Sequence, residues 1–395
     1  LSYYDSRVGN EVLTGAGLDP ELPVHQSLLR LVAEIADFPR HLSIHPGGFL
    51  LGHEPVHHMV PIEPATMEAR TVIQWDKDDL ESLKLMKVDV LALGMLSAIH
   101  KCFQLVKRFH QQDLTIAEIT RRQDDPEVYG MIQKADTVGV FQIESRAQMS
   151  MLPRLRPKTY YDLVIQIAIV RPGPIQGDMV HPFLKRRDGI EPVTFPSDEV
   201  KDVLSRTMGV PIFQEQVIKL AMVAAGFSGG EADQLRRAMA SWKKNGDLVK
   251  FRTKLIEGML ARGYEQEFAE RIFDQILGFG EYGFPESHSA SFAVLAYCSA
   301  WLKHYHPEAF YASLLNSLPM GFYSASQLVQ DARRHNVLIL PVCVNQSHYD
   351  HQVVHCGNRL AIRLGFRQVK GFSAESALQL LKARGKQGFQ HPKQL

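Results

Sequence analysis

The sequence predicts an α+β fold that is mostly α-helical. Strand-like runs are confined to the region before residue 95, and nearly every apolar pattern from there to about residue 340 has helical spacing. The chain has 395 residues, 45% of them hydrophobic and 22% charged, which is enough for a large buried core and two or three structural units.

The first region begins with helical spacing between residues 11 and 38. The Pro46-Gly47-Gly48 turn then leads into a predicted strand at 49–51. Further strands are predicted at 71–75 and 85–91, where β-branched and aromatic residues gather. Together these runs predict one small sheet.

The long helical body is interrupted by caps and helix breakers at Asp162 and at residues 171–174, 228–230 and 278–285. A last change comes at residues 360–364, followed by glycines up to Gly371 and a helix over Ala374–Arg384. This order is similar to the start of a helix-hairpin-helix unit, in which a glycine turn offers backbone amides to DNA phosphates.

Composition excludes several classes of protein. No apolar run reaches about eighteen residues, and the first residues show neither an initiating Met nor a signal peptide, so we expect a cytoplasmic protein with no membrane contact. No Walker GxxxxGK[ST] motif is present. The cysteines form no CxxC pair and are expected to be buried small hydrophobes: Cys102, Cys298, Cys343 and Cys356.

The segment from Lys87 to Gly94 is the first candidate for chemistry. In a strand, Lys87 and Asp89 project from one face while Val88 and Val90 face a buried side. The carboxylate could hold a divalent metal and the lysine could neutralise a phosphate. A plain ion pair on a solvated strand has the same pattern and is the commoner case.

Basic residues form the second group of candidates, although the net charge is only +1. Four of them recur at helical spacing and could clamp a triphosphate or a DNA backbone: Arg236, Arg237, Lys243 and Lys244. Other clusters lie beside turns and aromatics, at Arg146, Arg154, Arg156 and Lys158, and at Lys185, Arg186 and Arg187. Separate basic sites suit an extended polyanion, but a solvated basic helix face is at least as common.

Two further segments have the residues of a binding site. Ser287 and His288 stand at the expected start of a helix near Ala290, where an anion could bind; a capping serine with a satisfied histidine is equally consistent. The segment 207–216 is a candidate template contact, and the alternative is a helix N-terminus capped by Gln214 and Glu215.

Seven segments, taken in order, resemble the bacterial DNA polymerase III alpha subunit and its relatives, the C-family DNA polymerases. They are His45–Gly48, Lys87–Gly94, Gly139–Ser145, Arg171–Pro174, Gln214–Gln216, Leu235–Met239, and Tyr282–Phe284 running into Ser287–Ser289. The wording of residues 74–79, 87–90 and 285–288 is more similar to the error-prone, damage-tolerant branch.

The resemblance implies a domain order. Residues 1–44 would be the end of the thumb, 45–94 the second part of the palm with a nucleotidyltransferase-like sheet, 95–345 the fingers, and 346–395 the start of a helix-hairpin-helix domain. It also implies two-metal phosphoryl transfer with Mg2+, in which the primer 3′-hydroxyl attacks the α-phosphate of a dNTP.

The same resemblance assigns roles to residues. Asp89 would be a catalytic metal ligand, and five residues would face the nucleotide: Lys87, Arg236, Arg237, Ser287 and His288. Primer-template DNA would be bound by Arg146, Lys243, Lys244 and Lys370. In the error-prone branch, expected partners are a Y-family-like accessory protein and the sliding clamp.

The chain departs from the family pattern at the metal site. The family's other two ligands form an Asp-x-Asp pair on an apolar strand, whereas Asp76-x-Asp78 and Glu265-x-Glu267 lie in polar or helical surroundings. We therefore expect a fragment that is inactive alone. A non-catalytic DNA-binding module and a fragment of the replicative alpha subunit are the alternatives.

Overall fold

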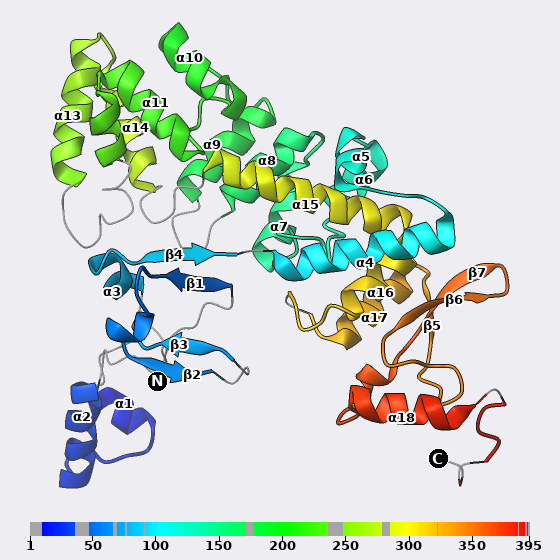
Figure 1. Cartoon of the computed structure of the whole chain (residues 1–395). Helices are drawn as coiled ribbons and strands as arrows, with labels where there is room; N and C mark the ends of the chain where they lie inside the picture. The colour runs from blue at the N-terminus through cyan, green and yellow to red at the C-terminus, as the bar shows by residue number, and fades with distance from the viewer. Residues whose placement is uncertain are drawn as a thin grey trace. The chain divides into compact units, whose positions relative to one another are not determined.

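The computed structural model describes residues 10–35, 47–65, 69–75, 77–90, 92–122, 124–170, 177–235, 248–278, 285–321, 323–385, 387–391 and 393 (Figure 1). The chain divides into two units, residues 1–92 and 93–395. Small sheets and many helices make the fold α+β and mostly α, as the sequence predicts.

The first unit contains two helices followed by two small sheets. The helices are α1 (Asn10–Gly15) and α2 (Pro23–Ile35), and a 3-10 turn η1 (Val56–His58) and α3 (Lys77–Ser82) lie between the strands. Strand β1 (Gly48–Leu51) pairs antiparallel with β4 (Met86–Asp89), and β2 (Ile62–Pro64) pairs antiparallel with β3 (Thr71–Ile73). The three predicted strands are confirmed as β1, β3 and β4, while β2 was not predicted.

The expectation of one buried sheet is wrong for the described strands. They form two sheets of two strands each, and large apolar side chains on or next to β1 and β4 are exposed: Phe49, Leu51, Met86 and Val90. A two-stranded sheet offers too little surface to enclose both of its faces. Lys87 and Asp89 therefore belong to a thin sheet with solvent-exposed residues around them.

The second unit is a long helical body. Its helices up to residue 225 are α4 (Leu93–His110), α5 (Ile116–Arg121), α6 (Pro126–Gln133), α7 (Arg146–Leu155), α8 (Tyr160–Ile169), α9 (Gly177–Arg187), α10 (Asp198–Leu204), the 3-10 turn η3 (Ser205–Thr207) and α11 (Gln214–Ala225). They are followed by α13 (Leu248–Ala261), α14 (Gln266–Gly278), α15 (Glu286–Tyr305), α16 (Pro307–Leu315) and α17 (Ala325–Arg334).

Helix α15 packs against α8 and is central to this body. Next to it, α16 packs against α4 (Figure 1). Every residue of α8 from Leu163 to Ile169 is buried. Alanines at 293, 296 and 300 keep the buried face of α15 shallow, so the two helix backbones can approach closely. The predicted cap at Asp162 is confirmed, since it forms a reciprocal capping box with Thr159 at the start of α8.

A third sheet ends the chain and was not predicted as a sheet. Strand β7 (Arg359–Arg363) lies in the middle, parallel to β5 (Leu338–Leu340) and antiparallel to β6 (Gln352–Cys356). The 3-10 turn η4 (Phe366–Gln368) and α18 (Ala374–Arg384) follow, and the predicted bounds of that helix are confirmed. These elements stand where the start of a helix-hairpin-helix domain is expected.

The cysteine prediction is half right. All four cysteines are free, and Cys102 and Cys298 are buried in the helical body, but Cys343 is half-buried and Cys356 is exposed at the end of β6. Among the described residues, no helix has both the length and the apolarity needed to cross a membrane.

Candidate functional site

The N-terminus of α15 is held by side chains from three other elements. The backbone N–H of Glu286 donates to Oε2 of Glu215 on α11 at 2.9 Å. The carboxylate of Glu286 accepts from the Tyr161 hydroxyl of α8 at 2.8 Å and from the Arg206 guanidinium of η3 at 3.2 Å. Arg206 also lies over the Tyr161 ring, 3.8 Å from its centroid. The first turn of α15 is therefore fixed by charge-assisted bonds.

Two predicted site residues lie on this first turn. Ser287 is exposed and His288 is half-buried, and the His288 ring packs against Phe292 with centroids 4.2 Å apart. Burial lowers the pKa of His288. The helix begins at Glu286, four residues earlier than predicted, so Ser287 is not its cap; the Glu215 carboxylate takes the first free N–H instead.

The segment 207–216 contains a capped helix N-terminus, as the alternative interpretation predicted, but the capping residue differs from the predicted Gln214 and Glu215. Helix α11 begins at Gln214, and the buried Gln216 caps it, since its Oε1 accepts from the backbone N–H groups of Ile212 and Phe213 at 2.9 and 3.2 Å. Its Nε2 donates to the Thr207 hydroxyl at 2.9 Å. Glu215 is thereby free of capping its own helix and reaches α15.

The loop 139–145, one of the seven matching segments, packs on α15 beside His288. The backbone N–H of Phe141 donates to the Ser299 hydroxyl at 3.1 Å, and the Phe141 ring meets Phe292 edge-on at 5.2 Å. Gly139 has φ +74°, and a Cβ there would lie 2.6 Å from Leu314 Cδ1, so this position requires glycine.

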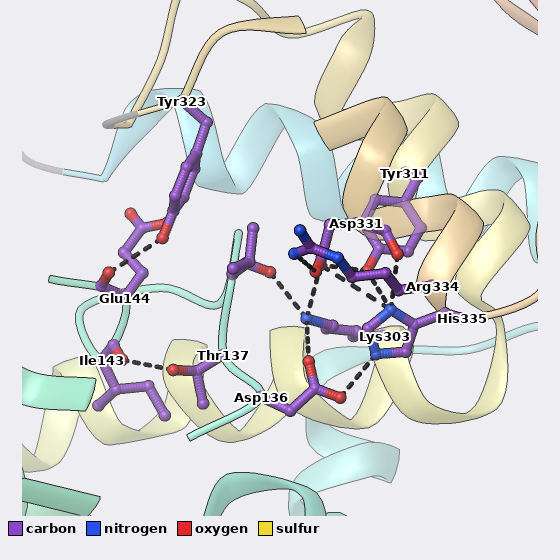
Figure 2. A network of polar contacts seen from close by, with 11 residues as sticks. Asp136, Thr137, Ile143, Glu144, Lys303, Tyr311, Tyr323, Asp331, Arg334 and His335 are labelled. Atoms are coloured by element: carbon purple, nitrogen blue, oxygen red, sulfur yellow. Dashed lines mark hydrogen bonds and ion pairs between the residues drawn. The ribbon is translucent and has the colours of Figure 1, made fainter. Parts of the chain in front are cut away.

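A buried polar network anchors the stem of that loop (Figure 2). Nζ of Lys303 on α15 lies 2.9 Å from Oδ1 of Asp136, 3.0 Å from Oδ2 of Asp331 and 3.1 Å from the carbonyl oxygen of Val138. Nε2 of His335 lies 2.6 Å from Oδ2 of Asp136. Lys303 therefore joins the loop, α15 and α17.

The network also sets the charge of its members. Burial opposes ionisation of Asp136, but the bonds from His335 and Lys303 hold its pKa at about 2. The hydrogen bond to Asp136 raises the pKa of His335. Farther along the loop, burial raises the pKa of Glu144 to about 7, while Tyr323 donates its hydroxyl to the Glu144 carbonyl at 2.9 Å.

The other predicted site residues that the structure describes belong to other elements. Lys87 lies exposed on β4 opposite Leu50, and the backbone of Asp89 pairs with Gly48. Arg146 is exposed at the first position of α7, and Lys370 is exposed in the turn before Gly371. The side chain of Asp89 and the residues Arg236, Arg237, Lys243 and Lys244 lie outside what the structure describes.

The basic clusters near residues 154 and 186 are more balanced than predicted. Arg156 pairs with Asp188, Lys185 with Glu191 at 2.9 Å, and Arg187 with Asp162. Three of the residues line the region's pocket of about 350 Å³, namely Arg154, Arg156 and Lys185. The acids that pair with Arg156 and Arg187 are 32 and 25 residues away in the sequence, whereas Glu191 is 6 residues from Lys185.

Sequence reasoning missed Lys303, Arg206, Tyr161 and Glu286. Lys303 could have been suspected, because it follows the apolar Ala300-Trp301-Leu302 run of a helix with few charges. Arg206 and Glu286 are 80 residues apart, and no pattern in the sequence pairs them.

Two groups of side chains in the described residues bring three metal-ligating atoms within 4.8 Å of one another. The first, Asp136, Asp331 and His335, already surrounds the Lys303 ammonium, which supplies the positive charge. The second is His110, His306 and Glu308. Burial, and then the neighbouring His110, lowers the pKa of His306 to about 4.

Comparison with known proteins finds three matching family models in order along the chain. The bacterial DNA polymerase III alpha NTPase domain matches residues 6–92, the bacterial DNA polymerase III alpha subunit finger domain matches residues 95–263, and a helix-hairpin-helix motif matches residues 336–395.

Curated relatives match nearly the whole chain. The error-prone DNA polymerase of Vibrio campbellii is 73% identical over 374 residues, which cover 94% of this chain and 36% of the relative. That of Vibrio vulnificus strain YJ016 is 70% identical and that of Teredinibacter turnerae 58% identical; the matches cover 98% and 100% of this chain and 38% of each relative. The chain spans a little over a third of the length of these relatives.

Proposed function

We propose that this chain is part of an enzyme that extends a DNA primer along a template. The chain belongs to the C-family DNA polymerases, which are related to the bacterial DNA polymerase III alpha subunit. The observation that carries the proposal is the near-complete match to relatives named error-prone DNA polymerase. That name also favours synthesis across damaged template as the role of the whole enzyme, which would work in the cytoplasm.

The domain order proposed is thumb end, palm part, fingers and helix-hairpin-helix start, with bounds at residues 44, 94 and 345. The division of the chain after Ala92 and the finger-domain match beginning at residue 95 support the second of these bounds. The N-terminal turn of α15, with exposed Ser287 and half-buried His288, is the proposed fingers contact to the incoming dNTP. Arg236 and Arg237 are proposed to contribute to the same surface.

The Mg2+ chemistry of the family needs more ligands than the described residues of the first unit bring together. Asp89 contributes one carboxylate, and no group of three ligating side chains is found among the described residues of that unit. Mg2+ is usually held by one or two carboxylates together with substrate phosphates, and two ions need more. We therefore propose that Asp89 completes a site whose other ligands come from the part of the polymerase that this chain does not span.

The test is primer extension by complementation. The chain is mixed with a separately expressed N-terminal segment that carries the Asp-x-Asp strand, with primer-template, dNTPs and Mg2+. The proposal is supported if the mixture extends the primer, if the Asp89→Asn chain does not, and if the control Glu63→Gln on β2 still does. Extension that survives Asp89→Asn excludes Asp89 as a ligand, and template with an abasic site tests the damage-tolerant role.

A DNA-binding module without catalysis is the second candidate, favoured by the exposed Arg146 and Lys370. A fingers surface binds dNTP, whereas a simple clamp binds only DNA with a steep salt dependence. Measuring dNTP binding separates the two candidates. A fingers surface is favoured if Ser287→Ala and His288→Ala weaken dNTP binding while Ser291→Ala, one turn along the helix, does not. Partners such as a Y-family-like protein and the sliding clamp are proposed from the error-prone branch alone.

A further inference from the structure

His110, His306 and Glu308 form a second cluster in the helical body, separate from the turn of α15 and from the Lys303 network. His110 is the last residue of α4, while His306 and Glu308 lie at the junction of α15 and α16. One ligand atom of each residue lies within 4.8 Å of the other two. The side chains of His110 and Glu308 are 29% and 13% exposed, and His306 is 5% exposed, so the cluster is largely shielded from water.

One ring nitrogen of His306 is left without a hydrogen bond within the described part of the chain. Nε2 of His110 lies 2.6 Å from Oε1 of Glu308, and the His110 and His306 rings meet edge-on with centroids 4.6 Å apart. Nδ1 of His306 is buried and has no hydrogen-bond partner among the described residues. A buried ring nitrogen without a partner is uncommon in proteins, and a water or ion is a frequent explanation.

We propose that His110, His306 and Glu308 bind a divalent transition metal ion of the zinc class. Two imidazoles and one carboxylate are a donor set that zinc accepts, with a fourth position left for water. Mg2+ prefers oxygen ligands in an octahedral arrangement, so it suits this cluster poorly.

The dimensions of the cluster fit this ion after a small adjustment. Zinc bonds of about 2.0–2.2 Å in tetrahedral geometry place two ligand atoms about 3.3 Å apart. The His110 and Glu308 atoms at 2.6 Å would separate slightly as the ion replaces the proton they share. The bound ion joins the end of α4 to the start of α16, two helices that already pack together. The proposal is independent of the Mg2+ chemistry discussed above.

The experiment measures zinc binding by the metal-stripped chain. Isothermal titration with Zn2+ alone, and with Mg2+ alone, is run on the unaltered chain and on His110→Asn and Glu308→Gln. Glu308→Gln keeps an amide oxygen that can accept from His110, so the fold is expected to be retained, and circular dichroism checks this. His304→Asn, two residues before His306 and outside the cluster, is the matched control.

The expected result is one Zn2+ per chain at micromolar affinity or tighter, no comparable Mg2+ binding, and at least a tenfold loss in His110→Asn and Glu308→Gln. X-ray absorption of the zinc-bound chain is expected to show nitrogen and oxygen ligands without sulfur. The proposal is overturned if the stripped chain binds no Zn2+ saturably, or if folded His110→Asn and Glu308→Gln chains bind it as tightly as His304→Asn does.

Discussion

Nζ of Lys303 lies 2.9 Å from Oδ1 of Asp136, at a position where the lysine side chain is completely shielded from solvent. A buried ammonium is stable only with close anionic partners, and Asp331, 3.0 Å away, is the second. The three charged groups come from α15, from α17 and from the stem of the loop that contains Gly139 and Glu144 (Figure 2). The position of that loop against α15 therefore depends on an ion network.

Lys303→Met is expected to destabilise the chain by about 3 to 5 kcal/mol, because it leaves two carboxylates without their cation in a shielded place. The free energy of unfolding is measured by urea denaturation. Lys107→Met is the control: its ammonium pairs with Asp113 at 2.8 Å, but its side chain is 63% exposed, so a loss below about 1 kcal/mol is expected. Equal losses in the two variants would contradict a structural role for the network.

The same network predicts a pH dependence. The hydrogen bond to Asp136 raises the pKa of His335 above its usual 6.5, so protonated His335 stabilises the fold. This contribution is fully present below pH 6.5 and is lost as the pH rises through the raised pKa. Unfolding free energies measured from pH 6 to pH 9 are expected to fall less in His335→Gln than in the unaltered chain.

Two observations decide whether the slope belongs to His335. The exposed His355→Gln is expected to keep the slope of the unaltered chain. Asp136, whose pKa lies at about 2, stays ionised across this range and contributes no slope of its own. A His335→Gln profile parallel to that of the unaltered chain would refute the assignment.

Glu144→Gln is expected to stabilise the chain at pH 8. Burial raises the pKa of Glu144 from 4.5 to about 7, so its ionised form is disfavoured in the folded state, and stability falls as pH rises from 4.5 to 7. The shift corresponds to at most about 3 kcal/mol. Thermal unfolding at pH 8 and pH 4 measures the effect, which is expected to be nearly absent at pH 4, below the pKa of the carboxyl in both states. The exposed Glu257→Gln on α13 is expected to change neither value.

The sequence predicted those features of the fold whose interacting residues are close together along the chain. The Thr159–Asp162 capping box, the bounds of α18 and the strands β1, β3 and β4 rest on neighbouring residues, and local patterns predicted them. Strand β2 has three residues ending in Pro64, which is too short to leave a period. One buried sheet was predicted because the alternation of polar and apolar residues in β4 indicates that the strand has an apolar face. The pattern does not show whether other residues cover that face.

The candidate site was less predictable for the same reason. Ser287 and His288 were predicted as site residues because polar residues beside a helix start are a local signal, and this role stays a prediction. Lys303 was not found because its partner Asp136 lies 167 residues away, and a lone lysine in a helix is usually solvated. Likewise, Asp188, which pairs with Arg156, lies 32 residues away in the sequence.

The last prediction concerns the DNA contacts proposed for the exposed Arg146 and Lys370. Each substitution, Arg146→Ala or Lys370→Ala, is expected to weaken primer-template binding for all sequences and to reduce the slope of log affinity against log salt by about 1, because one phosphate contact is lost. Fluorescence anisotropy at several KCl concentrations measures both quantities. Lys107→Ala removes an equal charge that is already paired with Asp113, so its slope is expected to equal that of the unaltered chain. Loss of an electrostatic contact to phosphate reduces the number of counterions released on binding, and so reduces the slope. If Arg146→Ala and Lys370→Ala leave the slope at the value of the unaltered chain, these two residues do not contact DNA phosphates.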